Sequence, residues 1–395
     1  MAPNDSFLFD ADNHYYEPRD AFSRYIEPRF RDKAIHQVKD EAGNDRVMIG
    51  DQPFTFLKNT YTENVTKPGA LREMLRNMSN ESYSESQLVE PLQPAYTNRD
   101  ARLQLMDEQG LQSILLFPTL AVCVEQAMKD DVEQNYANLH SFNRWLHEDW
   151  GFDHLGRIFA VPLLSLLDVD RAVAELEWVM EHGARVVHLR PGPAFGRSPA
   201  DAHFDPFWER VNEARLAVAL HIGESGYNEM MSVHFGENAN PSSHMQSAFQ
   251  WTSFYGDRPI MDTISSLIFH NLFGRFPNIR VLSVENGSLW VPYLMKVMDK
   301  MKGMGRNGPW PGGYVKGRPS EVLKQHVFVS PYHEEDIVGL AAGVGASQVL
   351  FGSDFPHPEG LANPAEFENE LTGLSETDIR AIMFENMQRL VSGNS

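Results

Sequence analysis

Short, continuous apolar runs alternate with segments of helical periodicity over most of the chain. A run of roughly four to eight apolar residues is typical of a strand that is buried on both faces, as in a parallel sheet. In the helical segments apolar residues recur at spacings of three and four, as Leu139, Phe142, Leu146 and Trp150 do. We count eight strand-like runs, at residues 7–9, 114–117, 158–164, 186–189, 216–220, 279–284, 327–330 and 349–351.

A helical segment follows each of these runs. Helices are expected near residues 99–109, 139–150, 169–180, 206–214, 261–275, 289–301 and 334–342, and the C-terminal stretch to about 390 is expected to be helical. Eight alternating units predict an α/β fold, a (β/α)8 TIM barrel that forms a single domain over residues 1–395. A doubly wound open sheet is the alternative architecture.

Two polar segments interrupt this rhythm. Residues 19–95 follow the first strand and contain a strand-like fragment at 46–49 and an Asn/Ser/Glu-rich stretch at 77–86. Residues 224–257 follow the fifth strand. We interpret both as excursions from the barrel that form a flap or an oligomer contact, and we expect a homo- or hetero-oligomer.

Composition narrows the class of protein. The formal charge is −20 and the pI about 5.1, with no cluster of Lys and Arg, which argues against a nucleic-acid partner. No apolar run approaches the ~18–20 residues of a membrane span. The single cysteine, Cys123, excludes an internal disulfide, and the first six residues lack the apolar core of a signal peptide. These features predict a cytoplasmic enzyme.

Polar residues stand where the predicted strands end. They are Asp12 and His14 after the first strand, Arg190 after the fourth, His221 after the fifth, Glu285 after the sixth, Ser330 after the seventh and Asp354 after the eighth. In a (β/α)8 barrel the carboxyl ends of the strands meet at one mouth, where the active site lies. These side chains are therefore expected to converge.

Four of these residues are suitable metal ligands. Two histidines and two carboxylates can bind Zn²⁺, Mn²⁺ or Fe²⁺. Asp12 and His14 are two residues apart, so on a strand they point to the same side and can bind one ion. Each has a structural alternative, because Asp12 can cap a helix, Asp354 can form a turn and His221 can bond a backbone carbonyl.

Three motifs resemble one known family. The segment DADNHYYEP (10–18) resembles the opening motif of the amidohydrolase superfamily. More narrowly, GRFPNIR (274–280), His221 and GSDFPH (352–357) are similar in order to the amidohydrolase-related family that includes aminocarboxymuconate-semialdehyde decarboxylase. The resemblance implies a (β/α)8 barrel with one divalent metal ion, whose ligands map to Asp12, His14, His221 and Asp354.

The sequence departs from this family at two places. The usual opening, His-x-His or Glu-x-His, is Asp12-x-His14 here, and a harder ligand set favours Mn²⁺ or Fe²⁺ somewhat over Zn²⁺. The usual His-x-Gly after the sixth strand is Glu285-Asn286-Gly287. Glu285 can act as a proton shuttle, as a further metal ligand, or as a buried carboxylate paired with an arginine.

The resemblance and the ligand set together favour a metal-dependent enzyme that decarboxylates or hydrolyses a small carboxylic acid. In this interpretation Asp354 is a ligand and a proton acceptor, Glu285 or His270 is the second acid/base, and Arg190 anchors a substrate carboxylate. Arg190 can equally pair with Glu285 or another buried acid, and His270 can equally be a histidine of the core or of a helix face.

Two alternatives stay open. One is a non-haem diiron oxygenase on the same barrel, with a second iron held by Glu17, His270 and Glu285, and with His333 and His357 as weaker candidates. The other is a supporting subunit of a hetero-oligomeric enzyme.

Overall fold

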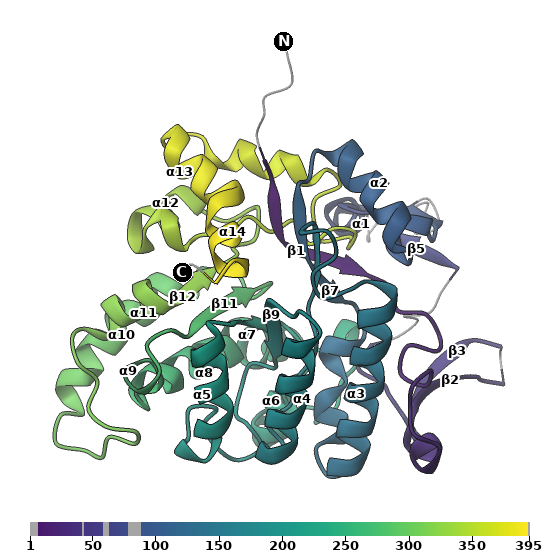
Figure 1. The fold of residues 1–395 in the computed structure, drawn as a ribbon, viewed down its shortest axis with the longest axis horizontal. Coiled ribbons are helices and arrows are strands. Elements are labelled where there is room, and N and C mark those ends of the chain that lie inside the picture. The colour runs from purple at the N-terminus through teal and green to yellow at the C-terminus, as the bar shows by residue number, and fades with distance from the viewer. Residues whose placement is uncertain (1–6, 42, 58–62, 78–87, 394–395) are drawn as a thin grey trace.

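The computed structural model describes residues 7–41, 43–57, 63–77 and 88–393, and its centre is built from two parallel sheets (Figure 1). The first sheet contains β1 (Phe9–Tyr15), β7 (Ser113–Pro118) and β8 (Ile158–Ala160), in the order β1-β7-β8. The second contains β9 (Val186–Leu189), β10 (Ala217–His221), β11 (Arg280–Val284) and β12 (Val327–Val329), in the order β12-β11-β10-β9. The α/β class and the parallel pairing are as predicted.

Backbone contacts link the outer edges of the two sheets. Beyond β8, residues 162–164 pair with β9, and residues 349–351 bridge to β12. The amide of Ala11 in β1 donates to the carbonyl of Phe351 over 2.7 Å. The predicted strand at 349–351 forms only these bridges, because the amide of Phe351 donates to Ile382 in the C-terminal helical segment instead of to a neighbouring strand.

Helices surround the strands (Figure 1). They are α2 (Arg99–Gln109), α3 (Val132–Asp149), α4 (Val169–Glu181), α5 (Asp205–Ala214), α8 (Asp257–Phe269), α9 (Leu272–Arg275), α10 (Trp290–Met304), α11 (Pro319–His326), α12 (Ile337–Val344), α13 (Glu376–Arg380) and α14 (Asn386–Val391). The sequence did not predict α11, which follows a Gly/Pro-rich loop. Pro319 begins this helix, where a proline needs no amide partner, and Leu323 anchors it in the core.

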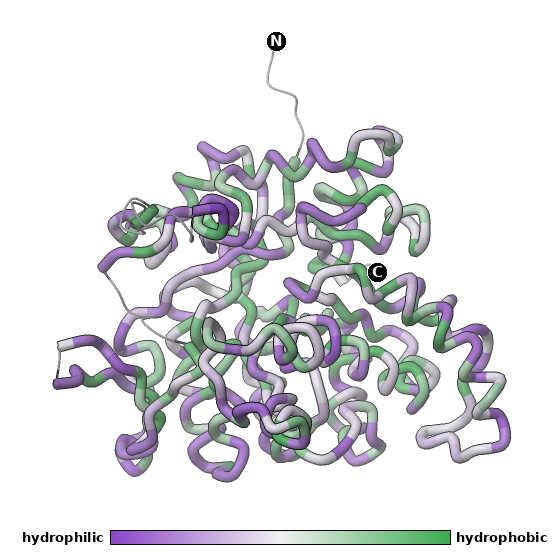
Figure 2. The backbone as a smooth tube through the Cα atoms, turned by 180° about the vertical axis from the view of Figure 1, so that it is seen from behind, coloured by the Kyte–Doolittle hydropathy of each residue, from purple (hydrophilic) through white to green (hydrophobic). Residues whose placement is uncertain are grey.

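Each central strand is buried on both faces. In β10, Ala217 and Ala219 pack with one apolar cluster, and Val218 and Leu220 pack with another. Successive side chains of a strand point to opposite faces, so the continuous apolar run serves both clusters. Figure 2 shows the apolar residues concentrated along the central segments and the polar residues on the outer loops.

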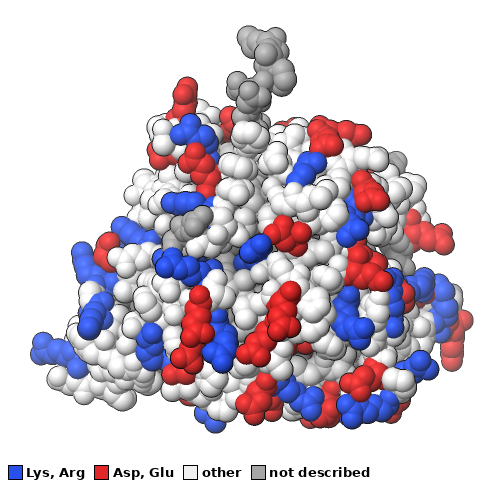
Figure 3. Space-filling view, viewed as in Figure 1, with Lys and Arg blue, Asp and Glu red and all other residues white. Residues whose placement is uncertain are grey.

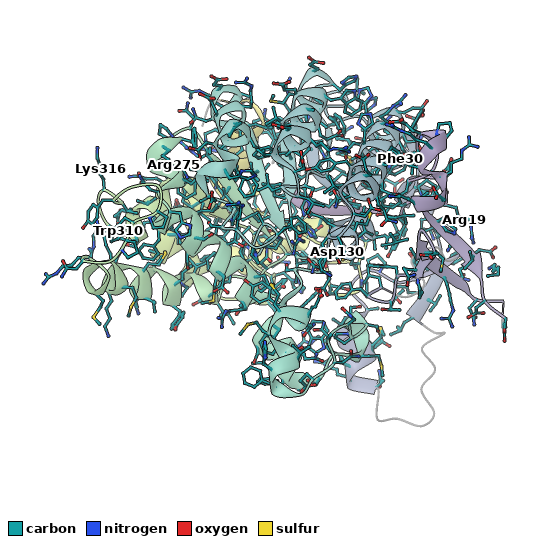
Figure 4. All side chains as sticks on the ribbon, turned by 90° about the horizontal axis from the view of Figure 1, so that it is seen from below. Arg19, Phe30, Asp130, Arg275, Trp310 and Lys316 are labelled. Carbon is teal, nitrogen blue, oxygen red and sulfur yellow. The ribbon has the colours of Figure 1, made fainter. Side chains whose placement is uncertain are left out.

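The two polar excursions contain secondary structure of their own. The first holds β2 (Ile35–Lys39), β3 (Asp45–Ile49), β4 (Gln52–Pro53), β5 (Asn64–Thr66), α1 (Leu71–Asn77) and β6 (Val89–Pro91), and the second holds α6 (Tyr227–Met230) and α7 (Ala248–Phe254). Most of the Asn/Ser/Glu-rich stretch lies outside the described residues. The excursions meet where Ser243 donates its amide to the carbonyl of Phe56 over 2.8 Å. Parts of both project from one side of the molecule (Figure 4).

The surface carries both signs of charge. Acidic and basic side chains are intermixed on the face shown in Figure 3. Within the part of the chain that the structure describes, no helix combines the length and apolar character needed to cross a membrane.

Candidate metal centre

Four side chains from the ends of three strands converge on one point. Asp12 and His14 come from β1, His221 ends β10, and Glu285 follows β11. The Nε2 atoms of His14 and His221 are 3.3 Å apart. Asp12 Oδ1 lies 3.2 Å from His14 Nε2, and Glu285 Oε2 lies 3.2 Å from His221 Nε2. Every such ligand atom of the four residues lies within 4.8 Å of the others.

Asp354 belongs to a second, overlapping group with His14, Glu285 and His357. Its Oδ1 atom is 3.4 Å from His14 Nε2. The four residues expected from the resemblance are thus divided between two groups that share His14 and Glu285: Asp12 and His221 lie in the first, and Asp354 lies with His357 in the second.

A buried hydrogen-bond network fixes the end of β1. The carboxylate of Asp10 accepts bonds from the amide of Ser353 at 2.9 Å and from its hydroxyl at 2.5 Å. On the other side Arg102 donates to the side chain of Asn13 and to the carbonyl of His14. These contacts hold the Asp12–His14 segment against the segment that carries Asp354.

The two acidic residues at the strand ends have unusual backbones. Glu285 and Asp354 adopt φ values of 54° and 55°, in the left-handed region that residues other than glycine rarely occupy. Such conformations cost on the order of 1–3 kcal/mol each and cluster at functional sites. The fold therefore keeps two residues in conformations that cost free energy, and in these conformations both carboxylates face the cluster.

Gly352 leaves room for the centre. A Cβ atom at this position would lie 2.2 Å from Ser330 Oγ and 2.8 Å from Asp12 Cβ. We predict that Gly352→Ala destabilises the protein by about 1–3 kcal/mol, because a buried methyl group would displace Asp12 or Ser330. Thermal unfolding measures this loss. Gly343→Ala in α12 is the matched control and is expected to show no loss, because an added Cβ there would meet no side chain or distant backbone of the described residues within 4 Å. Equal melting temperatures for Gly352→Ala and wild type would contradict this account.

The pKa values of the two histidines are shifted in opposite directions. Burial and the nearby His357 lower the pKa of His14 to about 3, so His14 is neutral. Burial also lowers the pKa of His221, but its bond to Asp12 and the charge of Glu285 outweigh that effect and raise the pKa above its usual value. The Nδ1 atom of His221 lies 2.9 Å from the carbonyl of Ile222, which can only accept, so Nδ1 carries a proton and Nε2 faces the cluster.

The pKa values of the three carboxyl groups are also shifted in different directions. Burial raises the pKa of Asp12, but hydrogen bonds from His14 and His221 outweigh it and hold that pKa well below the usual range. Burial raises the pKa of Glu285 to about 8, although His221 lowers it by more than Asp12 raises it. Burial raises the pKa of Asp354 well above its usual value, and the neighbouring carboxyl group of Glu285 raises it further. Asp12 therefore favours the ionised form more strongly than Glu285 or Asp354 does.

These donors fit a divalent cation. Two imidazole nitrogens and up to three carboxylates point at one another from short range, an arrangement that is repulsive without a proton or a cation between them. The hydrogen bond from His221 Nδ1 to a backbone carbonyl is the kind of contact that orients metal-binding histidines. A mixed set of imidazole and carboxylate donors suits Zn²⁺, Mn²⁺ or Fe²⁺.

His357 and Thr119 support Asp354. The Nδ1 atom of His357 lies 2.7 Å from Asp354 Oδ1. The hydroxyl of Thr119 donates to the carbonyl of Tyr15, so it accepts the proton of His357 Nε2 over 3.0 Å. Thr119 thereby fixes the orientation of His357, and His357 fixes that of Asp354.

A cavity of about 450 Å³ opens above the cluster. It is lined by His14, His221, Glu285 and His357 and, around them, by Tyr16, Leu57, Val65, Val89, Thr119, Val122, Cys123, Ile222, Ser243, Trp251, Tyr255 and Glu359, among others. Both excursions contribute to its walls. A site of this size and largely apolar lining is typical of small-molecule binding.

Arg190 does not line this cavity, so its expected role as a substrate anchor is corrected. Its side chain is buried beside that of Glu125, with Nε 3.5 Å from Glu125 Oε2. It also donates to the carbonyl of Pro193 over 3.3 Å. The strand end points Arg190 into a structural ion pair under the neighbouring loop.

His270 is likewise placed away from the cluster, which corrects its expected role as acid/base. It ends α8, and a helix that precedes a barrel strand ends at the opposite side of the sheet from the strand's carboxyl terminus. His270 lines a separate hollow with Trp310, and its carbonyl accepts from Arg275. Figure 4 labels Trp310 and Arg275 near one another, away from the projecting parts of the excursions.

Glu17 is buried beside the cluster but faces the backbone. Its Oε1 atom accepts from the amides of Leu120 and Ala121 at 2.9 and 2.8 Å. Its Oε2 atom is buried without a hydrogen-bond partner among the described residues. Burial raises the pKa of Glu17 to about 7. These contacts favour a structural role over a role as ligand to a second metal.

The Glu17 contacts lead to a prediction about pH. Because the pKa of Glu17 is higher in the folded protein, the unfolded chain loses this proton first as the pH rises. Glu17 therefore lowers the free energy of unfolding progressively between about pH 4.5 and pH 7. Glu17→Gln removes this loss and keeps an acceptor for both amides. We predict that Glu17→Gln is more stable than wild type from pH 5 to pH 8, by up to about 3 kcal/mol in unfolding free energy, and that its melting temperature is higher. Its metal content should be unchanged. A loss of metal would instead identify Glu17 as a ligand.

The sequence interpretation missed Thr119, Trp251 and Tyr255, and gave little weight to His357. Thr119 directly follows the β7 strand, so the same rule of polar residues at strand ends identifies it. His357 stands three residues after Asp354, in the same motif. Trp251 and Tyr255 lie in an excursion whose folding back over the mouth leaves no periodic signal in the sequence.

The chain is similar to known proteins of one family. The sequence model of the amidohydrolase family matches residues 10–392 of this chain. The solved structure of an amidohydrolase from Mycobacterium avium subsp. paratuberculosis K-10 is similar to the chain at 36% identity, covering 99% of this chain and 100% of that one, with a TM-score of 0.88. No curated protein matches the sequence.

More distant structures share the fold. The 5-carboxyvanillate decarboxylase LigW from Sphingomonas paucimobilis is 16% identical over 98% of this chain and 99% of its own, with a TM-score of 0.64. A dihydroxybenzoic acid decarboxylase from Polaromonas sp. JS666, with bound manganese and the inhibitor 2-nitroresorcinol, is 16% identical over 99% of this chain and 98% of its own, with a TM-score of 0.59.

Proposed function

Since the chain belongs to the amidohydrolase family, we propose that it is a metal-dependent enzyme that decarboxylates a small carboxylic acid. The family membership confirms the resemblance seen in the sequence. The observation that carries the proposal is the convergence of His14, His221 and the carboxylates at the floor of a cavity large enough for a small organic acid.

We assign Asp12, His14, His221 and Asp354 as ligands of one divalent ion, Zn²⁺, Mn²⁺ or Fe²⁺. When bound, such an ion neutralises charge on the oxygens of the acid. His221 directs Nε2 to this position through its bond to Ile222, and His357 holds Asp354. The manganese in a decarboxylase of the same fold is consistent with this assignment.

Glu285 is the proton donor in this proposal. Decarboxylation breaks a carbon–carbon bond, releases CO₂ and leaves an electron pair on carbon, which then takes up a proton. A carboxyl group whose pKa is raised to about 8 is protonated at neutral pH and can supply that proton. Hydrolysis of a C–N or C–C bond, the related possibility, needs a base to activate water, and this protonation state favours it less.

The wider architecture supports the same proposal. We propose that the two sheets and residues 349–351 form one closed (β/α)8 barrel in a single domain, with the excursions inserted after its first and fifth strands. Exposed apolar residues on the second excursion, such as Phe235 and Met245, favour an oligomer. The acidic net charge argues against a nucleic-acid partner.

The alternative is a diiron oxygenase, favoured by the second group of ligand-type residues, His14, Glu285, Asp354 and His357. A second iron there would have to displace His357 from its bonds to Asp354 and Thr119. A supporting subunit would have no need of the donor set.

Release of CO₂ tests the proposal. Protein loaded with Mn²⁺ or Zn²⁺ is incubated with a panel of aromatic and aliphatic carboxylic acids. We expect metal-dependent release of CO₂ from at least one acid without consumption of O₂. O₂ consumption with two irons per chain would favour the oxygenase, and hydrolysis of amides or esters without CO₂ would favour a hydrolase.

A further inference from the structure

The cavity wall contributed by the second excursion carries a phenol, that of Tyr255. This residue stands between α7 and α8 and lines the same cavity as His14, His221 and Glu285. Its ring packs edge-on against Trp251 with a centroid distance of 4.8 Å, and lies 6.3 Å from the ring of Phe56 in the first excursion. Both excursions therefore hold the ring in place.

The hydroxyl of Tyr255 makes no hydrogen bond to any of the residues that the structure describes, and the residue is half-buried in the cavity wall. The hydroxyl of Tyr332, by contrast, is engaged by the protein, since it donates to the carbonyl of Glu285 over 3.0 Å. A donor in the cavity wall that has no partner among the described residues can bond to water or to an oxygen of a bound ligand.

The surroundings of this hydroxyl keep it a donor. Burial raises the pKa of Tyr255 well above its usual value, and the nearby Cys123 and Glu285 raise it further. The phenol is protonated, and one of the acids that influence it belongs to the metal centre. A substrate held at that centre lies within the same cavity as the unpaired hydroxyl.

We propose that Tyr255 is a substrate-binding residue whose hydroxyl donates a hydrogen bond to an oxygen of the acid bound at the metal centre. This inference rests on the proposed function. It makes the second excursion part of the active site and assigns it a role in selecting substrates that present an acceptor oxygen to this wall.

Removal of the hydroxyl tests the inference. The variant Tyr255→Phe keeps the ring and its packing against Trp251 and Phe56. Because the lost hydroxyl has no partner among the described residues, thermal stability and metal content are expected to stay at the wild-type level. The matched control is Tyr293→Phe, which removes a phenol that is 60% exposed on α10.

Binding of benzoate and of 2-hydroxybenzoate to the manganese-loaded proteins is measured by calorimetry. We expect Tyr255→Phe to weaken at least one probe by about 10- to 100-fold, as for a hydrogen bond to a charged acceptor, and Tyr293→Phe to weaken neither. A loss of affinity confined to 2-hydroxybenzoate places the hydrogen bond at the phenolic oxygen of the probe. A loss of affinity for both probes places it at the carboxylate.

Other outcomes overturn the inference in distinguishable ways. Unchanged binding of both probes by Tyr255→Phe, or a clear drop in its melting temperature, contradicts the role of Tyr255 and leaves the proposed function intact. Failure of the metal-loaded wild type to bind either probe contradicts the proposed function, and the inference with it.

Discussion

Replacing His221 with alanine is expected to empty the metal centre and to abolish activity. The Nε2 atom of His221 lies 3.2 Å from Glu285 Oε2 and 3.3 Å from His14 Nε2, so it is central to the donor set. Without it we expect metal content to fall to a small fraction of the wild-type value and turnover to drop by at least about 1,000-fold, equivalent to about 4 kcal/mol of transition-state stabilisation.

The His221→Ala measurement combines elemental analysis with circular dichroism. Secondary structure should persist, because the β10 strand is held by backbone bonds to both β9 and β11. His203→Ala, which removes an exposed histidine, is the matched control and should retain metal and activity. A folded His221→Ala protein with full metal content would show that this histidine is not a ligand.

Replacing Glu285 with glutamine should separate chemistry from metal binding. The amide side chain of Glu285→Gln keeps the size of the carboxyl side chain but cannot transfer a proton. We expect metal content to stay near the wild-type level and turnover to fall by about 100- to 10,000-fold, the usual contribution of general acid–base catalysis. The alkaline decline of kcat that ionisation of this acid imposes on the wild type should be absent from the residual activity.

Glu359→Gln provides the comparison for this variant. Glu359 lines the same cavity but belongs to neither group of converging ligand atoms. Its loss is expected to change activity far less than the loss of Glu285. If Glu285→Gln instead loses its metal, Glu285 is a ligand, and the proton must come from another group.

The barrel-like core was predictable because its strands are short and continuously apolar. Both faces of each strand are buried, so the whole run must be apolar, and the polar residue that follows marks the end of the strand. This rule located Asp12, His14, His221, Glu285 and Asp354, which the structure brings together. The predicted helix at 99–109 coincides with α2, whose start is fixed by the side chain of Asn98.

Polar side chains at strand ends do not all face the mouth, and other predicted site residues lie elsewhere in the fold. Arg190 follows β9 as expected, but the buried carboxylate of Glu125, distant in sequence, draws its side chain away from the mouth. His270 has a suitable side chain for the site, yet the end of α8 places it on the far side of the sheet. The pairing of Arg190 depends on a contact distant in sequence, so only the assembled fold reveals it. The position of His270 at the end of the helix that precedes the sixth strand already separates it from the mouth.

The cavity walls were the least predictable part. Their residues come from the two excursions, whose short strands and helices are held by contacts such as that between Ser243 and Phe56. Such long-range contacts leave no periodicity in the sequence. Tyr255 became a candidate for substrate binding only when its position over the centre and its unpaired hydroxyl were known.

Elemental analysis of the wild-type protein, purified without added metal or chelator, is the decisive test of the proposed metal centre. We expect about one equivalent of manganese, zinc or iron per chain, lost in His221→Ala and retained in Glu285→Gln. A folded wild-type protein that contains no metal, and binds none when it is supplied, would contradict the proposed centre.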